Sequence, residues 1–211
     1  MLKIAIDFLC WANNLSYKLI SSLVVRENDG VHPKHRIMNY HKFFLDNIKK
    51  TDAILDIGCG NGSVAADLAD KARIVVGIDI DRKNIADAKK LHKQNNLTYI
   101  TGDATSYPFN EKFDTIILSN VLEHINQRVQ FLHGIKNLAP KILIRVPLIT
   151  RDWLAVYKKE RGLEYRLDPT HFIEYTEKDF KKELSEAGVA IENYYIKFGE
   201  LYAITKPNEE R

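Results

Sequence analysis

The stretch AILDIGCGNG, Ala53–Gly62, decides the fold. Residues 53–57 are apolar except for Asp56 and predict a buried strand. Glycines follow at alternate positions: Gly58, Gly60 and Gly62. Glycine lets a backbone turn sharply and come close to a ligand. The stretch therefore predicts a strand that ends in a ligand-binding turn, with Asp56 placed where a carboxylate can meet a positively charged group.

The composition is that of one soluble domain with modest additions. The chain has 211 residues, of which 45% are hydrophobic and 28% charged. A net charge of +3 is too small to indicate a nucleic acid or an anionic membrane as partner. Cys10 and Cys59 are far apart and form no metal-type pair. This cysteine usage favours a reducing compartment, so we expect a cytoplasmic protein.

Strand and helix patterns alternate on both sides of the glycine turn. The expected strands are residues 53–57, 74–78, 98–101, 113–119 and 141–146, and the expected helices between them are residues 63–70, 82–95 and 127–138. Such alternation is typical of a parallel sheet with helices on both faces. A helix at 177–187 precedes two strands, 191–197 and 200–205, whose short connection at Phe198-Gly199 makes them antiparallel. The sequence predicts an α/β, doubly wound, mostly parallel seven-stranded sheet with the last strand antiparallel.

Residues 1–50 predict a helical N-terminal extension, with helices at 1–25 and 40–50. Apolar residues recur at three- and four-residue steps in the first helix, which makes it amphipathic. Charged and amide side chains interrupt it, so no run of about 18 uncharged apolar residues exists. Two interpretations stay open: a helix packed on the domain, or one that contacts a membrane surface or a partner. The domain itself is expected at 51–211, with a lid-like insertion at 147–176.

Acidic residues end the second and third expected strands. Asp79 lies about 20 residues after Gly58, the place where an acid accepts hydrogen bonds from ribose hydroxyls. Asp103 follows the third strand, where it can bind an adenine amino group. Two nucleoside cofactors have this geometry, a dinucleotide and S-adenosylmethionine. The dinucleotide pattern G-x-G-x-x-G requires glycine where Ser63 stands, and acids near the turn suit the cationic S-adenosylmethionine.

Four ordered segments carry a resemblance to a known family. They are LDIGCGNG at 55–62, VVGIDID at 75–81, GDATSYPF at 102–109 and FDTIILSNVLEHI at 113–125. Together they resemble the class I S-adenosylmethionine-dependent methyltransferases, and SNVLEHI is similar to the small-molecule branch that acts on quinone precursors. The resemblance implies a Rossmann-like methyltransferase fold with S-adenosyl-L-methionine as cofactor. It also implies, position by position, a cofactor-binding set: Arg36, Asp56, Gly58, Cys59, Gly60, Asp79, Ile80, Asp103, Ala104, Ser119 and Asn120.

Roles within this set also follow from the resemblance. The Asp56–Gly60 stretch lines the methionine part, Arg36 meets the methionine carboxylate, and Asp79 with Ile80 holds the ribose and stacks on the adenine. Asp103 and Ala104 face the adenine edge, and Ser119 with Asn120 lies under the sulfonium. Cys59 has a second interpretation as a small packed residue.

Histidines near the strand ends are the expected catalytic residues. His124 follows the fourth strand and His171 lies in the insertion, and either can act as base toward a hydroxyl. Some RNA ribose methyltransferases of this superfamily have a Glu-x-x-Glu-His metal run. Here Asn120 replaces the first acid before Glu123, so metal dependence stays open.

The resulting hypothesis is O-methylation of a small organic or sugar acceptor. The run after the fourth strand reads SNVL rather than the N/D-P-P-Y/F of base amino methylases, and no nucleic-acid partner is expected. A non-catalytic S-adenosylmethionine-binding regulatory protein is the alternative from another class, and an NAD-linked oxidoreductase is a weaker one. The identity of the acceptor, the choice between O-, N- and C-methylation and the oligomeric state stay open.

Overall fold

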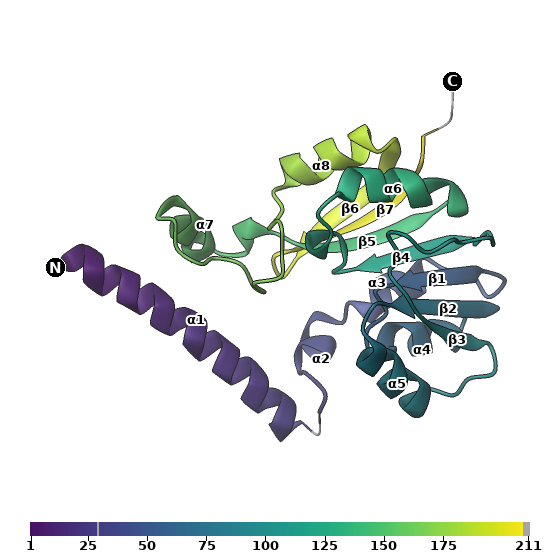
Figure 1. The fold of residues 1–211 in the computed structure, drawn as a ribbon, viewed down its shortest axis with the longest axis horizontal. Coiled ribbons are helices and arrows are strands. Elements are labelled where there is room, and N and C mark those ends of the chain that lie inside the picture. The colour runs from purple at the N-terminus through teal and green to yellow at the C-terminus, as the bar shows by residue number, and fades with distance from the viewer. Residues whose placement is uncertain (29, 209–211) are drawn as a thin grey trace.

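The computed structural model describes residues 1–28 and 30–208 and contains one seven-stranded sheet. The strand order is β3-β2-β1-β4-β5-β7-β6 (Figure 1). The strands are β1 Ala53–Ile57, β2 Ile74–Asp79, β3 Leu97–Thr101, β4 Thr115–Ser119, β5 Ile142–Pro147, β6 Val189–Lys197 and β7 Glu200–Pro207. Strands β1 to β5 pair in parallel, whereas β7 is antiparallel to both β5 and β6. The predicted fold class is confirmed.

Helices cover both faces of the sheet. The helices after the glycine turn are α4 Ser63–Ala69, α5 Arg82–Leu91, α6 Arg128–Ile135, α7 Trp153–Glu160 and α8 Glu177–Glu186, with 3₁₀ turns η1 Leu122–His124, η2 Lys136–Leu138 and η3 Ile149–Arg151. Leu55 and Ile57 share one buried cluster with α6 and α8, while Ile54 belongs to a second cluster with α4 and α5. Because side chains alternate along a strand, both faces of β1 are apolar and all five of its residues are buried.

Two helices were not predicted from the sequence. Helix α2, Lys34–Met38, lies in the segment expected to be a turn-rich connection, and α7 lies in the insertion. Residues 153–160 mix aromatic and charged side chains with little periodicity, but Asp152 accepts a hydrogen bond from the amide of Ala155 at 2.7 Å and starts α7. Helix α3, His41–Asp46, and α5 are shorter than expected. The backbone of His92 is extended because the chain must return to β3.

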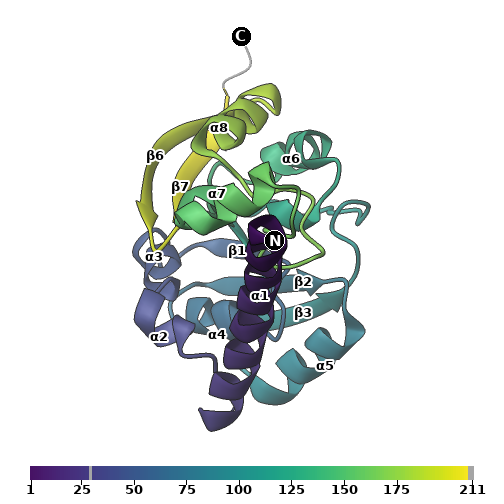
Figure 2. The ribbon, with the colours of Figure 1, turned by 90° about the vertical axis from the view of Figure 1, so that its left-hand side faces the viewer.

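The first helix, α1 Leu2–Glu27, lies beside α7 at the edge of the molecule (Figures 1 and 2). The ammonium of Lys158 donates to Asn14 at 2.7 Å, and the guanidinium of Arg161 donates to Asp7 at 3.0 Å. Cys10 is the buried residue of this helix. Across residues 1–28 and 30–208, no helix combines the length and apolarity needed to cross a bilayer. The division into an extension at 1–50 and a domain at 51–211 stays a prediction.

Candidate functional site

The glycine turn is held against the end of β2. The amides of Gly58 and Cys59 both donate to the carbonyl of Ile78, at 2.8 and 3.1 Å. Gly58 and Gly60 have φ angles of +67° and +55°, a region that side chains disfavour. A Cβ added to Gly60 would meet no heavy atom of the described chain within 4 Å. The turn is therefore fixed on its β2 side and open at Gly60, as a ligand that lies close to the backbone requires.

Asp79 joins the turn to β2. Its Oδ2 accepts the amide of Gly60 at 2.8 Å, and its Oδ1 accepts the amide of Asp81, also at 2.8 Å. The neighbouring Ile80 is 70% exposed. An exposed isoleucine beside a fixed carboxylate has the form expected of a site for an adenine ring and its ribose.

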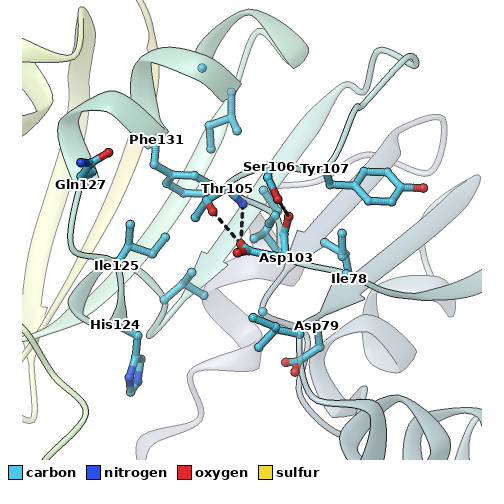
Figure 3. A pocket seen from close by; sticks show the side chains of 18 of the residues that line it. Ile78, Asp79, Asp103, Thr105, Ser106, Tyr107, His124, Ile125, Gln127 and Phe131 are labelled. Atoms are coloured by element: carbon cyan, nitrogen blue, oxygen red, sulfur yellow. Dashed lines mark hydrogen bonds between the residues drawn. The ribbon is translucent and has the colours of Figure 1, made fainter.

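A cavity of about 1070 Å³ lies beside the turn (Figure 3). Its wall comes from the carboxyl ends of β1 and β2, the 102–109 segment, η1 and α6. It brings together seven predicted site residues: Gly58, Asp79, Ile80, Asp103, Ala104, Asn120 and His124. Among the described residues, the other predicted ones, Arg36, Asp56, Cys59, Gly60, Ser119 and His171, lie outside this wall. Seven of the thirteen predicted site residues therefore share one cavity wall.

Asp103 organises the segment opposite the turn. Its Oδ1 accepts both the amide of Thr105 at 2.9 Å and the hydroxyl of Thr105 at 2.7 Å (Figure 3). These bonds close an Asx-type turn that leads into Ser106 and Tyr107 along the cavity wall. The carboxylate thus has a fixed position in the cavity, next to Ala104.

Asp56 is a buried acid that lacks a neutralising partner. Its side chain is 1% exposed, and its Oδ2 has no hydrogen-bond partner within residues 1–28 and 30–208. Burial, with a further contribution from the charge of Asp79, raises the pKa of Asp56 to about 8. A buried carboxyl at the end of β1 suits the ammonium group of a methionine moiety, so this residue fits S-adenosylmethionine.

The segment after β4 rests on a buried charged cluster that the sequence analysis missed. Arg145 of β5 pairs with Glu200, donates to the hydroxyl of Ser119 at 3.3 Å and lies 3.7 Å from the ring centroid of Tyr40. Asn120 follows with a φ of +57°. The signal was an arginine within the apolar run ILIRVP, since a charge in a buried strand needs partners.

The position of Arg36 does not decide whether this residue binds the methionine carboxylate, as predicted. Arg36 is exposed on α2. Two residues earlier, burial and then the charge of Arg145 lower the pKa of Lys34, while Glu200 acts in the opposite sense. The side chain of Lys34 is exposed like that of Arg36, and the role of Arg36 stays a prediction.

Cys59 lies in the packing beneath the turn. The thiol is buried, and burial raises its pKa far above the usual range. A Cβ added to Gly77 would lie 2.9 Å from the Cys59 sulfur. This close packing agrees with the interpretation of Cys59 as a small packed residue, and its contact with a cofactor stays a prediction.

The two histidines lie edge to face, with ring centroids 4.5 Å apart. His124 is exposed at the cavity wall, and its Nδ1 lies 2.9 Å from the hydroxyl of Thr170. His171 is 5% exposed, and its Nδ1 lies 2.9 Å from the carboxylate of Glu174. Burial and the neighbouring His171 lower the pKa of His124. His124 is therefore a neutral proton acceptor near pH 7, with His171 behind it.

Glu123 completes a group that could hold a metal ion. Its side chain is fully buried, and neither carboxylate oxygen has a hydrogen-bond partner in the part of the chain that the structure describes. Burial raises its pKa to about 8. One ligand atom each from Glu123, His124 and His171 lie within 4.8 Å of one another. Carboxylate and imidazole suit Zn²⁺, so metal dependence stays open.

Comparison with known proteins agrees with this geometry. Residues 55–140, which contain the glycine turn, Asp79, Asp103 and η1, match the family model described as a methyltransferase domain. Residues 55–140 therefore carry a methyltransferase domain, as the class I S-adenosylmethionine-dependent family requires. The predicted family is confirmed.

Relatives of this methyltransferase domain differ in the reaction they are named for. A ubiquinone biosynthesis O-methyltransferase of Bartonella tribocorum is 38% identical over 128 residues, which cover 58% of this chain and 50% of that protein. A probable cobalt-precorrin-6B C(15)-methyltransferase (decarboxylating) of Saccharolobus solfataricus is 35% identical over 48% of this chain and 56% of that protein. The chain spans about half the length of these relatives.

A solved structure shares the fold. Magnesium protoporphyrin IX methyltransferase from Synechocystis, with bound S-adenosylhomocysteine, has a TM-score of 0.63 and is 22% identical over 82% of each chain. The likeness extends beyond the matched domain, since 82% of the chain is more than residues 55–140.

The role of Asp79 is testable against a matched acid. Asp79→Ala removes the ribose acceptor and the acceptor of the Gly60 amide, so S-adenosylhomocysteine should bind about 10–100-fold more weakly, or about 1.5–3 kcal/mol. Asp81→Ala removes only the N-cap of α5, where the side chain of Asp81 accepts a hydrogen bond from the amide of Lys83 at 2.7 Å. That control should lose about 1 kcal/mol of stability and keep its affinity in calorimetry. Equal affinities of the two variants would exclude Asp79 as the ribose ligand.

Cofactor binding should depend on pH through Asp56. The free protein holds this carboxyl protonated below about pH 8, and an ammonium ligand favours the ionised form. Binding below that pH therefore releases a proton, and affinity should rise by up to about tenfold per pH unit and level off near pH 8. Titrations in buffers of different ionisation enthalpy measure the proton release. Asp56→Asn should bind weakly and without this slope, and a parent affinity independent of pH would contradict the assignment.

Proposed function

We propose that this chain transfers a methyl group from S-adenosylmethionine to a hydroxyl oxygen of a small organic or sugar acceptor. The observation that carries the proposal is His124, a histidine of lowered pKa exposed at the wall of the cofactor-sized cavity. Several relatives are named ubiquinone biosynthesis O-methyltransferases, which supports an oxygen acceptor.

The described residues divide the work of binding. Asp56 holds the ammonium group, Asp79 the ribose hydroxyls, and Asp103 the adenine amino group, while Ile80 and Ala104 contact the ring. When bound, S-adenosylmethionine supplies an electrophilic methyl group on a sulfonium. The chain's task is then to orient the acceptor in line with that methyl group and to remove the hydroxyl proton.

His124 takes this proton. Because its pKa is lowered, the imidazole is neutral near pH 7 and accepts the proton directly. Thr170 contacts the Nδ1 of His124 at 2.9 Å and leaves the other ring nitrogen for the acceptor. His171 acts as a positioning residue, since it is buried against the ring of His124 and is itself held by Glu174.

Three further points stay proposals. The name of the Saccharolobus relative supports carbon methylation as a second possibility, and Glu123 with the two histidines supports a metal-assisted variant. Contact of the N-terminal helix with a membrane surface is supported by the exposed apolar side chains of α1. A cytoplasmic location stays a prediction.

Single-turnover methyl transfer to a panel of catechols, sugars and a metabolite extract tests the base. His124→Ala should slow transfer by about 10²–10⁴-fold with cofactor affinity nearly unchanged. In the parent, the rate should rise with pH through a midpoint below 6.5, because the pKa of His124 is lowered. His171→Ala should reduce the rate of transfer less than His124→Ala does. It should also shift the midpoint of the pH profile toward 6.5, since the neighbouring His171 contributes to the lowered pKa of His124.

Three other outcomes separate the alternatives. Loss of activity with a chelator and recovery with one divalent ion would assign Glu123 and the histidines to a metal. Full activity of both histidine variants would indicate an acceptor that needs no base. Tight S-adenosylhomocysteine binding without transfer to any compound would favour the regulatory protein.

A further inference from the structure

Helix α1 presents a mostly apolar face to solvent over residues 1–23, interrupted by Ser16 and Ser22. At about 100° per residue, the exposed apolar side chains of residues 1–23 other than Tyr17 span an arc of about 180°. They include Ile4, Phe8, Trp11, Leu15, Leu19 and Leu23, which are between 43% and 73% exposed. The charged residues before Leu23, namely Lys3, Asp7 and Lys18, all lie on the other half of the helix. Exposed apolar surface of this extent marks an interaction site.

The other half of α1 makes hydrogen bonds to the rest of the chain, and these bonds fix the direction in which the apolar face points. Asp7 binds Arg161, which directly follows α7, and Asn14 binds Lys158 of α7. Ser21 lies 3.1 Å from the ring of His32. Figure 2 shows α1 in front of the rest of the molecule. The bonds of Asp7, Asn14 and Ser21 all lie on the half of the helix opposite the apolar face.

We infer that α1, with α7 beside it, lies in the interfacial region of an anionic lipid bilayer. A helix of 26 residues is about 39 Å long and can lie flat in the interface with its apolar side chains among the acyl chains. Charge supports this partner: α1 and residues 153–161 together contain six Lys and Arg against three Asp and Glu. Anionic lipid headgroups attract such a segment.

A lipid surface suits this face better than a second copy of the chain does. An arc of about half the circumference is wider than the narrow seam of a two-helix coiled coil. Two copies would also bring the basic segments together. Both tryptophans of the chain, Trp11 on α1 and Trp153 on α7, are exposed, by 58% and 75%. Tryptophan is enriched at the interface between lipid and water.

This orientation would turn the cofactor site toward the lipid. Helix α7 begins shortly after β5 ends at Pro147, so α7 and α1 lie on the side of the sheet where the parallel strands end (Figure 1). The cavity opens from the same strand ends. If the proposed methyl transfer is correct, the acceptor is an amphiphile whose hydroxyl lies near the headgroups.

Vesicle sedimentation tests the docking without any use of methyl transfer. The parent should bind phosphatidylcholine vesicles that contain phosphatidylglycerol more tightly than phosphatidylcholine alone, and added salt should weaken the binding. Phe8→Glu with Leu19→Glu should reduce binding by more than about tenfold, because both side chains leave the lipid and two negative charges are added. The matched control is Leu91→Glu with Ile196→Glu, at positions 62% and 45% exposed on α5 and β6. It should bind like the parent.

The outcomes distinguish the partners. Equal binding by the α1 variant, or an equal loss by the control, would overturn the inference. So would a parent that ignores vesicles but is a dimer in sedimentation velocity that the α1 variant dissociates. Circular dichroism and thermal unfolding check that each variant is folded. Because these assays need no cofactor, a failure of the proposed function leaves their result unaffected.

Single-tryptophan variants test whether α7 shares the face. Trp153→Phe leaves Trp11 as the only indole, and Trp11→Phe leaves Trp153. Lipids brominated on their acyl chains should quench both emissions when vesicles are added. Quenching of Trp11 alone would restrict the face to α1 and overturn the joint assignment, and quenching of neither would overturn the docking itself.

Discussion

One carboxylate, that of Asp79, connects the parts of the site. Its two oxygens accept the amides of Gly60 and Asp81, so the glycine turn after β1 and the start of α5 are fixed to the end of β2. The glycines of the turn have φ angles that only glycine adopts readily. The adjacent carbonyl of Ile78 accepts two further amides of the turn. The position of the glycine turn after β1 therefore depends on β2.

The fold could be predicted because its signals are local in the sequence. Strand β1 is apolar on both faces, and the glycines after it require a turn, so AILDIGCGNG specifies both an element and its end. The short Phe198-Gly199 connection requires β6 and β7 to be antiparallel, as the sheet shows. The residues at strand ends were predicted for the same reason, since carboxyl ends of parallel strands meet at one edge.

The rest of the site depends on contacts between distant residues, which no local pattern contains. Nothing in the sequence of the insertion indicates that His171 is buried behind His124 rather than exposed in the cavity. The pairing of Arg145 with Glu200 joins β5 to β7, which are separated along the chain by η3, α7, α8 and β6. The apolar period of α1 is visible in the sequence, but which half of the helix stays exposed is decided by Asp7 and Asn14 binding α7.

Buried polar groups without partners gather at this same edge of the sheet. Within the described residues, Asp56, Asn120 and Glu123 each bury at least one side-chain oxygen that lacks a hydrogen bond, and each such group lowers stability by an amount on the order of 1–3 kcal/mol. Their two carboxyls reduce this penalty by staying protonated, as their raised pKa values require. The apolar clusters on both faces of the sheet tolerate the loss. A ligand that supplies a cation to Asp56 or a donor to Asn120 removes part of the penalty only in the folded state. The protein is thus less stable without its ligand because its site is prepared to bind one.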